Sequence, residues 1–266
     1  MCWTPSSSER LLTPAHGPGV CPRCLNLTDR PGLCRACTAN QHHLAAMVPI
    51  SYSVGGEWLH HLVIAYKRDA DPFVPAAMGT LAALYNRFLT QHEECLAAAA
   101  GVSQFELVTT IPSAGPLRDL HHPLRRIVGE LIEATRGRYA RLLVRSDTPA
   151  IPRVFDPARY RATTALDGEA VLLIDDMWTS GASAQSAAAA LLDAGAGCVA
   201  ALVAARHLNR HWHANDSRLR RLAADGFDPG RCVLCSGGAA STARPAVPSG
   251  ARRVSTTATG ELAIRP

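Results

Sequence analysis

Charged and aromatic side chains are scarce in this chain of 266 residues, at 18% and 5% of the total. The 27 basic and 22 acidic side chains leave a net charge of +5. The stretch 237–266 holds four Arg and one Glu, so it contributes 4 − 1 = +3 and the rest of the chain only +2. Proteins that bind duplex DNA usually carry a dense basic face. The weak charge outside the final stretch therefore argues against that class.

An apolar leader is also missing, because residues 1–12 lack the hydrophobic core of a secretory signal peptide. We therefore expect a cytoplasmic protein. The stretch 187–205 is apolar enough to imitate a membrane span, with Asp193 as its single charge. It is rich in Ala and is interrupted by Gly195 and Gly197. This pattern predicts a helix, a glycine turn and a buried strand, and no membrane span.

The hydrophobic fraction of 47% is large enough for a sizeable core. Apolar runs predict strands over 105–111, 141–145, 171–174 and 198–204. Helical spacing predicts helices over 76–89, with Ala-rich text continuing to residue 100, and over 123–134, 183–194 and a charged stretch after Asn215. The stretch 146–164 holds three Pro and reads as a long loop.

The order strand, loop, helix, strand over 171–204 is that of a βαβ unit, and a continuous apolar strand is typical of a sheet covered on both faces. The predicted fold class is therefore α/β with a parallel sheet. We expect three parts: a small N-terminal zinc-binding module with a flexible start over 1–42, the α/β domain over 43–236, and a disordered basic tail over 237–266.

Six of the nine cysteines form three Cys-x2-Cys pairs. The first two pairs comprise Cys21, Cys24, Cys34 and Cys37. Four thiolates satisfy tetrahedral Zn²⁺ and leave no open position for chemistry, so this pattern predicts a structural zinc site that replaces a hydrophobic core. The alternatives are incidental free thiols or two disulfides.

The third pair, Cys232 and Cys235, is half of a metal site. Three histidines upstream could supply the other half: His207, His211 and His213. Alternatively, these histidines lie on the surface and the pair carries no metal or is redox-labile.

The most informative stretch runs from Val171 to Ser183. A buried strand delivers Asp175 and Asp176 to its carboxyl end, where open α/β sheets bind ligands and where carboxylates can accept hydrogen bonds from sugar hydroxyls. The following loop leads into a helix N-terminus, which suits a phosphate. Gly181 permits close approach of the backbone to an anion. The loop residues that we expect to bind the phosphate are Thr179, Ser180, Gly181, Ala182 and Ser183. Alternatively, the acids merely cap a strand and the loop is an ordinary turn.

This stretch resembles the phosphoribosyl pyrophosphate (PRPP) signature of type I phosphoribosyltransferases, apart from Trp178, where that signature has an aliphatic residue. With a four-cysteine module before it, the chain resembles the ComF-like branch of that family, which is associated with DNA uptake. The resemblance implies that PRPP binds with Mg²⁺, that Asp175 and Asp176 are catalytic, and that a loop at 112–115 binds pyrophosphate through Ser113 and Ala114, with Arg118 nearby.

The resemblance implies an enzyme, a pentosyl-transferring glycosyltransferase that moves the phosphoribosyl group to an unknown acceptor and releases pyrophosphate. The alternative is a non-catalytic protein on the same fold that senses PRPP or a nucleotide, or that acts as a partner in DNA uptake. The zinc module and the basic tail would then contact single-stranded nucleic acid or a competence protein. Two segments usual in the family are not recognisable at 119–126 and 160–165, which favours this alternative.

Several further side chains have two interpretations. They contact the phosphates or act as general bases, or they are solvated surface residues. They are Lys67, His121, His122, Arg125, Arg126 and Arg153.

Overall fold

The computed structural model describes residues 11–68, 72–113, 119, 121–212 and 214–236. The predicted flexible start and basic tail lie outside the described residues, apart from the stretch that begins at Leu11.

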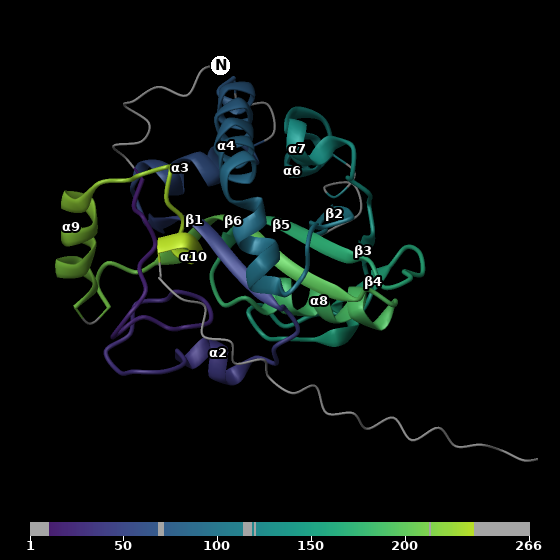
Figure 1. Cartoon of the computed structure of the whole chain (residues 1–266), viewed down its shortest axis with the longest axis horizontal. Coiled ribbons are helices and arrows are strands. Elements are labelled where there is room, and N and C mark those ends of the chain that lie inside the picture. The colour runs from purple at the N-terminus through teal and green to yellow at the C-terminus, as the bar shows by residue number, and fades with distance from the viewer. Residues whose placement is uncertain (1–10, 69–71, 114–118, 120, 213, 237–266) are drawn as a thin grey trace, which may run out of the picture.

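Four parallel strands form the central sheet, in the spatial order β1-β6-β5-β2 (Figure 1). They are β1 (Ala46–Val54), β2 (Leu107–Thr110), β5 (Ala170–Trp178) and β6 (Cys198–Leu208). The inner strands β5 and β6 are buried almost throughout, as expected for a parallel sheet with both faces covered. The predicted α/β class with a parallel sheet is confirmed.

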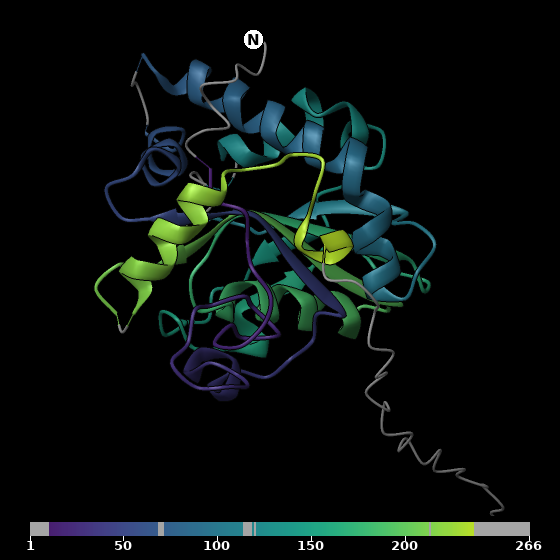
Figure 2. The same cartoon turned by 60° about the vertical axis from the view of Figure 1, so that its left-hand side comes forward.

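Helices cover both faces of this sheet (Figure 2). On one side lie α3 (Trp58–Ala65) and the long α4 (Val74–Ala100), and on the other lies α8 (Ala182–Asp193). The alternation along β5 follows from this arrangement. Leu172 and Ile174 join the core on the α4 side, whereas their neighbours in the strand join the core that α8 covers.

The predicted βαβ unit is confirmed as β5-α8-β6. The strand β5 continues past the apolar run to Trp178, because the residues after Ile174 still pair with β6. The apolar stretch 187–205 is the second half of α8, a glycine turn and most of β6. Gly195 has φ +106°, and a Cβ there would meet the carbonyl oxygen of Leu166 at 2.2 Å. In the described ranges, no helix is long and apolar enough to cross a membrane.

The prediction of one continuous helix over 123–134 is wrong. The structure divides it into α6 (Pro123–Arg126), the π-helical turn η1 (Ile127–Leu131) and α7 (Glu133–Arg136). The hydroxyl of Thr135 donates a 2.5 Å hydrogen bond to the carbonyl of Val128, which satisfies an acceptor that the wider π turn leaves open.

The predicted long loop contains two short elements, η2 (Pro157–Arg159) and β4 (Tyr160–Ala162). The strand β4 pairs antiparallel with β3 (Leu143–Arg145) in a small second sheet. The remaining elements are α2 (Arg35–Ala39), α9 (Asn215–Asp225) and α10 (Val233–Ser236).

Candidate functional site

The carboxyl ends of β2 and β5 lie side by side, because Thr110 pairs with Ile174 in parallel register. The chain leaves β5 toward α8 on one face of the sheet and leaves β2 toward α6 and α7, which pack on the α4 side (Figure 1). Adjacent strands whose connections diverge in this way frame the usual ligand crevice of an open α/β sheet. Asp175 and Asp176 of β5 and Ser113, three residues beyond β2, lie at this edge.

The carboxylate of Asp176 is buried and already has two partners. Lys67 Nζ forms an ion pair with Asp176 Oδ2, and the Tyr66 hydroxyl donates a hydrogen bond to the same oxygen. Burial raises the pKa of Tyr66 well above its ordinary value, so the phenol remains a donor. The Lys67 side chain is 33% exposed, and its charge is directed at Asp176.

Asp175 is in a different environment from its neighbour, since the residue is only partly buried. Its backbone carbonyl accepts a 2.6 Å hydrogen bond from the Tyr85 hydroxyl, and its Oδ1 accepts one of 3.0 Å from the Asp176 amide. Desolvation and the adjacent charge of Asp176 raise the pKa of Asp175 to about 7, while Lys67 opposes this shift. Asp175 therefore titrates near neutral pH.

The loop between β5 and α8 contains the predicted phosphate ligands. Thr179 is exposed, Ser180 is partly buried, and Gly181 has φ +81° immediately before the helix begins at Ala182. A Cβ at Gly181 would lie 2.1 Å from the ring of Trp178. The close approach that this glycine permits in the structure is therefore to the buried indole of Trp178.

Arg159, which sequence reasoning missed, lies at the first turn of α8. It is 4% exposed, and its Nη1 donates a 3.1 Å hydrogen bond to Ser183 Oγ. Its Nη2 donates to the carbonyls of Ile151 and Val154. Within the described part of the chain it has no carboxylate partner, and its Nε has no hydrogen-bond partner. The site thus places a buried cation without a counter-charge beside a helix N-terminus.

At the end of β2, the amide of Ser113 donates a 2.9 Å hydrogen bond to Asp119 Oδ1. Asp119 is buried and ion-paired with Arg141, and its carbonyl accepts from Arg125. These contacts fix Ser113 through a protein network. Arg126 pairs with Glu130 on the exposed face of its helix. Two predicted contributors to this loop, Ala114 and Arg118, lie outside the described residues.

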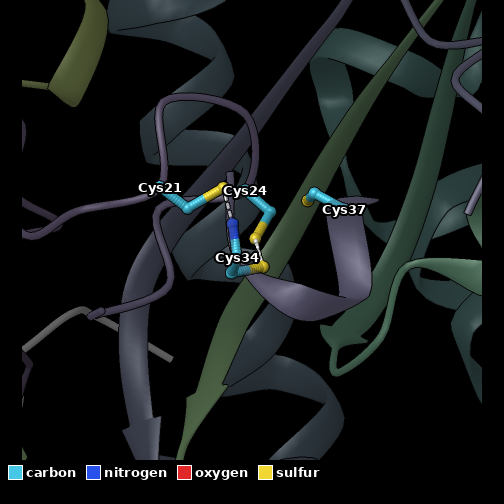
Figure 3. Close-up of side chains that lie close together, drawn as sticks. All are labelled: Cys21, Cys24, Cys34 and Cys37. Carbon is cyan, nitrogen blue, oxygen red and sulfur yellow. Dashed lines mark hydrogen bonds between the residues drawn. The ribbon is translucent and has the colours of Figure 1, made fainter. Parts of the chain in front are cut away.

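The four cysteines of the N-terminal module converge, as Figure 3 shows. Their sulfur atoms all lie within 4.8 Å of one another. Cys24 and Cys34 are 3.5 Å apart, and the Cys34 amide donates to Cys21 Sγ at 3.4 Å. All four thiols are buried and free, and a hydrogen bond with Cys24 lowers the pKa of Cys21. The cluster could bind a structural metal ion such as Zn²⁺.

The structure places neither His207 nor His211 beside the second pair. His207 is part of β6 and stacks on His60 at 5.1 Å, and His211 is exposed in the turn that follows. His213 lies outside the described residues. The structure instead gathers His92 and Cys95 of α4 with the pair, in a second cluster that comprises His92, Cys95, Cys232 and Cys235.

The cysteine module is attached to the acid-bearing edge through two side chains. Arg206 is buried, and it donates to the carbonyls of Cys24 at 3.0 Å and Trp178 at 3.1 Å. Asn40 Nδ2 donates a long hydrogen bond of 3.5 Å to the carbonyl of Ser180. The module therefore supports the backbone of the loop between β5 and α8.

The chain matches no protein-family model, and its comparison with curated proteins found no significant match. Two concave regions of the described surface lie away from the acid pair, one between α4 and residues 227–231 and one along the C-terminal half of α4. The candidate site thus rests on its side-chain chemistry.

Proposed function

We propose that the junction of β5 and α8 binds PRPP with Mg²⁺, and that the chain is a ComF-like, type I phosphoribosyltransferase-like protein that transfers the phosphoribosyl group to an acceptor. One observation carries the proposal. Carboxylates stand at one end of a short loop, and the buried Arg159, which lacks a carboxylate partner among the described residues, stands at the other. A sugar phosphate carries hydroxyls and a negative charge at the matching ends.

In this proposal the 5′-phosphate accepts hydrogen bonds from the loop 179–183, whose helix start offers amides without intrahelical partners. Arg159 supplies the positive charge that desolvation of the phosphate requires. The carboxylate of Asp175 accepts hydrogen bonds from the ribose hydroxyls. Both acids together stabilise the positive charge that develops on the ring as pyrophosphate leaves.

The transfer breaks the bond between the anomeric carbon and the pyrophosphate oxygen and forms one from that carbon to the acceptor, which loses a proton. Mg²⁺, when bound, would neutralise charge on the pyrophosphate. Among the described acids of this edge, Asp175 offers the hard oxygen ligand that suits this ion, since Asp176 is held by Lys67 and Tyr66.

The contacts of Asp176 with Lys67 and Tyr66 favour a second function, ligand binding without transfer. Asp176 is neutralised by Lys67 within the protein, which leaves one carboxylate for the developing charge. Asp119, in the segment that differs from the family, serves an internal network with Arg125 and Arg141. A sensor of PRPP or of a nucleotide needs the binding geometry alone. Such a protein would act through a partner, either single-stranded nucleic acid or a competence protein.

Calorimetric titration of the full chain with PRPP and Mg²⁺ tests the binding site. We expect Arg159→Gln to weaken binding by about 10- to 100-fold, because a hydrogen bond to a charged group contributes about 1.5–3 kcal/mol. Arg161→Gln is the matched control, since Arg161 is exposed on the neighbouring β4 and should leave affinity unchanged. The double substitution Asp175→Asn with Asp176→Asn should abolish measurable binding. Absence of binding to the wild type contradicts both functions.

Pyrophosphate release then separates an enzyme from a sensor. The assay supplies PRPP and Mg²⁺ with a panel of nucleobases, glutamine and ammonia as acceptors. Release that depends on one acceptor and is lost in Asp175→Asn supports transfer. Binding without release from any acceptor supports the sensor.

A further inference from the structure

The second cluster is assembled from two distant parts of the chain. His92 and Cys95 are three residues apart on α4, so they project from one face of the helix. Cys232 precedes α10 and Cys235 lies within it. One imidazole nitrogen and three sulfur atoms from these residues all lie within 4.8 Å of one another. Four donors from two segments thus meet at one point.

The imidazole of His92 is oriented for metal binding. His92 is 4% exposed, and Nε2 lies 3.0 Å from the carbonyl oxygen of Pro229. A carbonyl can only accept, so Nε2 carries the proton and Nδ1 presents its lone pair. Nδ1 lies 3.9 Å from Cys235 Sγ, on the cluster side. A ligating histidine that donates its other N–H to a carbonyl is the usual arrangement in metal sites.

The Cys-x2-Cys turn is arranged to hold thiolates. The amide of Cys232 donates to Cys235 Sγ at 3.1 Å, and the amide of Cys235 donates to Cys232 Sγ at 3.5 Å. Hydrogen bonds from amides favour the charged form of sulfur, which is the form that binds a metal. Both cysteines, and Cys95 beside them, are free thiols.

We propose that His92 Nδ1, Cys95, Cys232 and Cys235 bind a second structural Zn²⁺. Three sulfurs and one imidazole are a common tetrahedral set for structural zinc, and four protein ligands leave no position open for catalysis. This site does not depend on PRPP binding.

A metal ion at this site would link two elements that are far apart in the sequence. It fastens α10 to the C-terminal half of α4 at the end of the described chain (Figures 1 and 2). The segment before it contributes Phe227 and Pro229 to the lining of a concave region that Ile50, Leu84 and Phe88 also line. A metal bond to α4 adds to the contacts that hold this segment in place, which include the hydrogen bond between His92 and the Pro229 carbonyl and the apolar packing of Phe227.

Metal analysis of the full-length chain, purified with a thiol reductant, tests the proposal. We expect two Zn²⁺ per chain in the wild type and one in Cys232→Ser combined with Cys235→Ser. The controls are Cys198→Ser, a partly buried cysteine outside both clusters, and His207→Ala, one of the three upstream histidines that the sequence offers as ligands. Both controls should retain two. One zinc in the wild type, or two in the double variant, overturns the proposal.

Cobalt substitution provides a second measurement that does not require a variant to fold. The wild type should take up two Co²⁺ per chain, with charge-transfer absorption from seven Co–thiolate bonds, four from the first cluster and three from the second. Absorption from four bonds only, or a Cys232–Cys235 disulfide detected by mass in the reduced preparation, overturns the proposal.

Discussion

The cysteine module and the acid-bearing edge of the sheet differ in how their members are gathered. The four sulfurs of the module come from residues 21–37 and meet within 4.8 Å. The partners of Asp176 come from a segment more than 100 residues earlier, and Arg159 approaches α8 from a separate loop. Spacing along the chain therefore reveals ligands that are close in sequence, whereas the tuning of an acid or a phosphate site depends on contacts that only the fold creates.

The two regions are nevertheless coupled. Arg206 joins the backbone of Cys24 to that of Trp178, and Asn40 reaches the carbonyl of Ser180. A change in the module should therefore reach the loop that we propose to bind phosphate. Substitutions that remove the cysteine cluster or the Arg206 link measure this coupling.

Loss of the first cysteine cluster should have the largest effect. We expect Cys34→Ser to lower the free energy of unfolding by at least about 3 kcal/mol, because zinc binding supplies folding free energy to a segment with little core of its own. Thermal unfolding and proteolysis of residues 11–44 measure this change. The control is Cys198→Ser, which lies outside the clusters. Equal melting temperatures for the zinc-loaded and zinc-free wild type would contradict a structural metal.

Removal of the link should be the next largest effect. Arg206→Met leaves buried carbonyls of Cys24 and Trp178 without their donor, and we expect a loss of about 2–4 kcal/mol on unfolding in urea. Zinc should also leave the first cluster faster when measured with a colorimetric chelator. Arg220→Ala, with a 76% exposed side chain, is the control. An unchanged rate of zinc release shows that the module is independent of the sheet.

These contrasts between the two regions explain how much of the fold and of the candidate site could be predicted from the sequence. The unit β5-α8-β6 follows from apolar runs broken by Gly195, because both local periodicity and burial favour the same elements. The second cluster could be predicted only in half, since His92 and Cys95 lie on a helix far from Cys232. Their i,i+3 spacing was the one signal available. Arg159 gave none, because its burial depends on tertiary packing.

Within the acid pair, Asp176→Asn should destabilise the protein by about 1–3 kcal/mol at pH 8. Lys67 loses its counter-charge, and the Tyr66 hydroxyl loses a charged acceptor. Unfolding in urea measures the loss. Adding Lys67→Met removes the unpaired charge, so the double variant should recover part of the stability. The destabilisation of the double variant is compared with the sum of the destabilisations of the two single variants. If it equals or exceeds that sum, the ion pair does not stabilise the fold.

Asp175→Asn should have the opposite and smaller effect, a gain of about 1–2 kcal/mol at pH 8, because solvent reaches this partly buried carboxylate and weakens the full linkage effect of its raised pKa. Its pKa of about 7 in the folded protein exceeds the ordinary value of 3.8, so the folded state holds this proton more tightly than the unfolded chain does. Wild-type stability should therefore fall as pH rises from about 4 to about 7 and then receive no further change from this group.

The asparagine variant lacks this titration, so the stability difference between the two proteins should be near zero at pH 4 and reach its full size above pH 7. Urea unfolding across this range measures it. PRPP affinity should change in the opposite direction, because the carboxylate that costs stability is the one that we propose to receive the ribose hydroxyls. If Asp175→Asn is less stable than the wild type at pH 8, the Asp175 carboxylate is stabilised by contacts within the folded protein and does not require a ligand to compensate its charge.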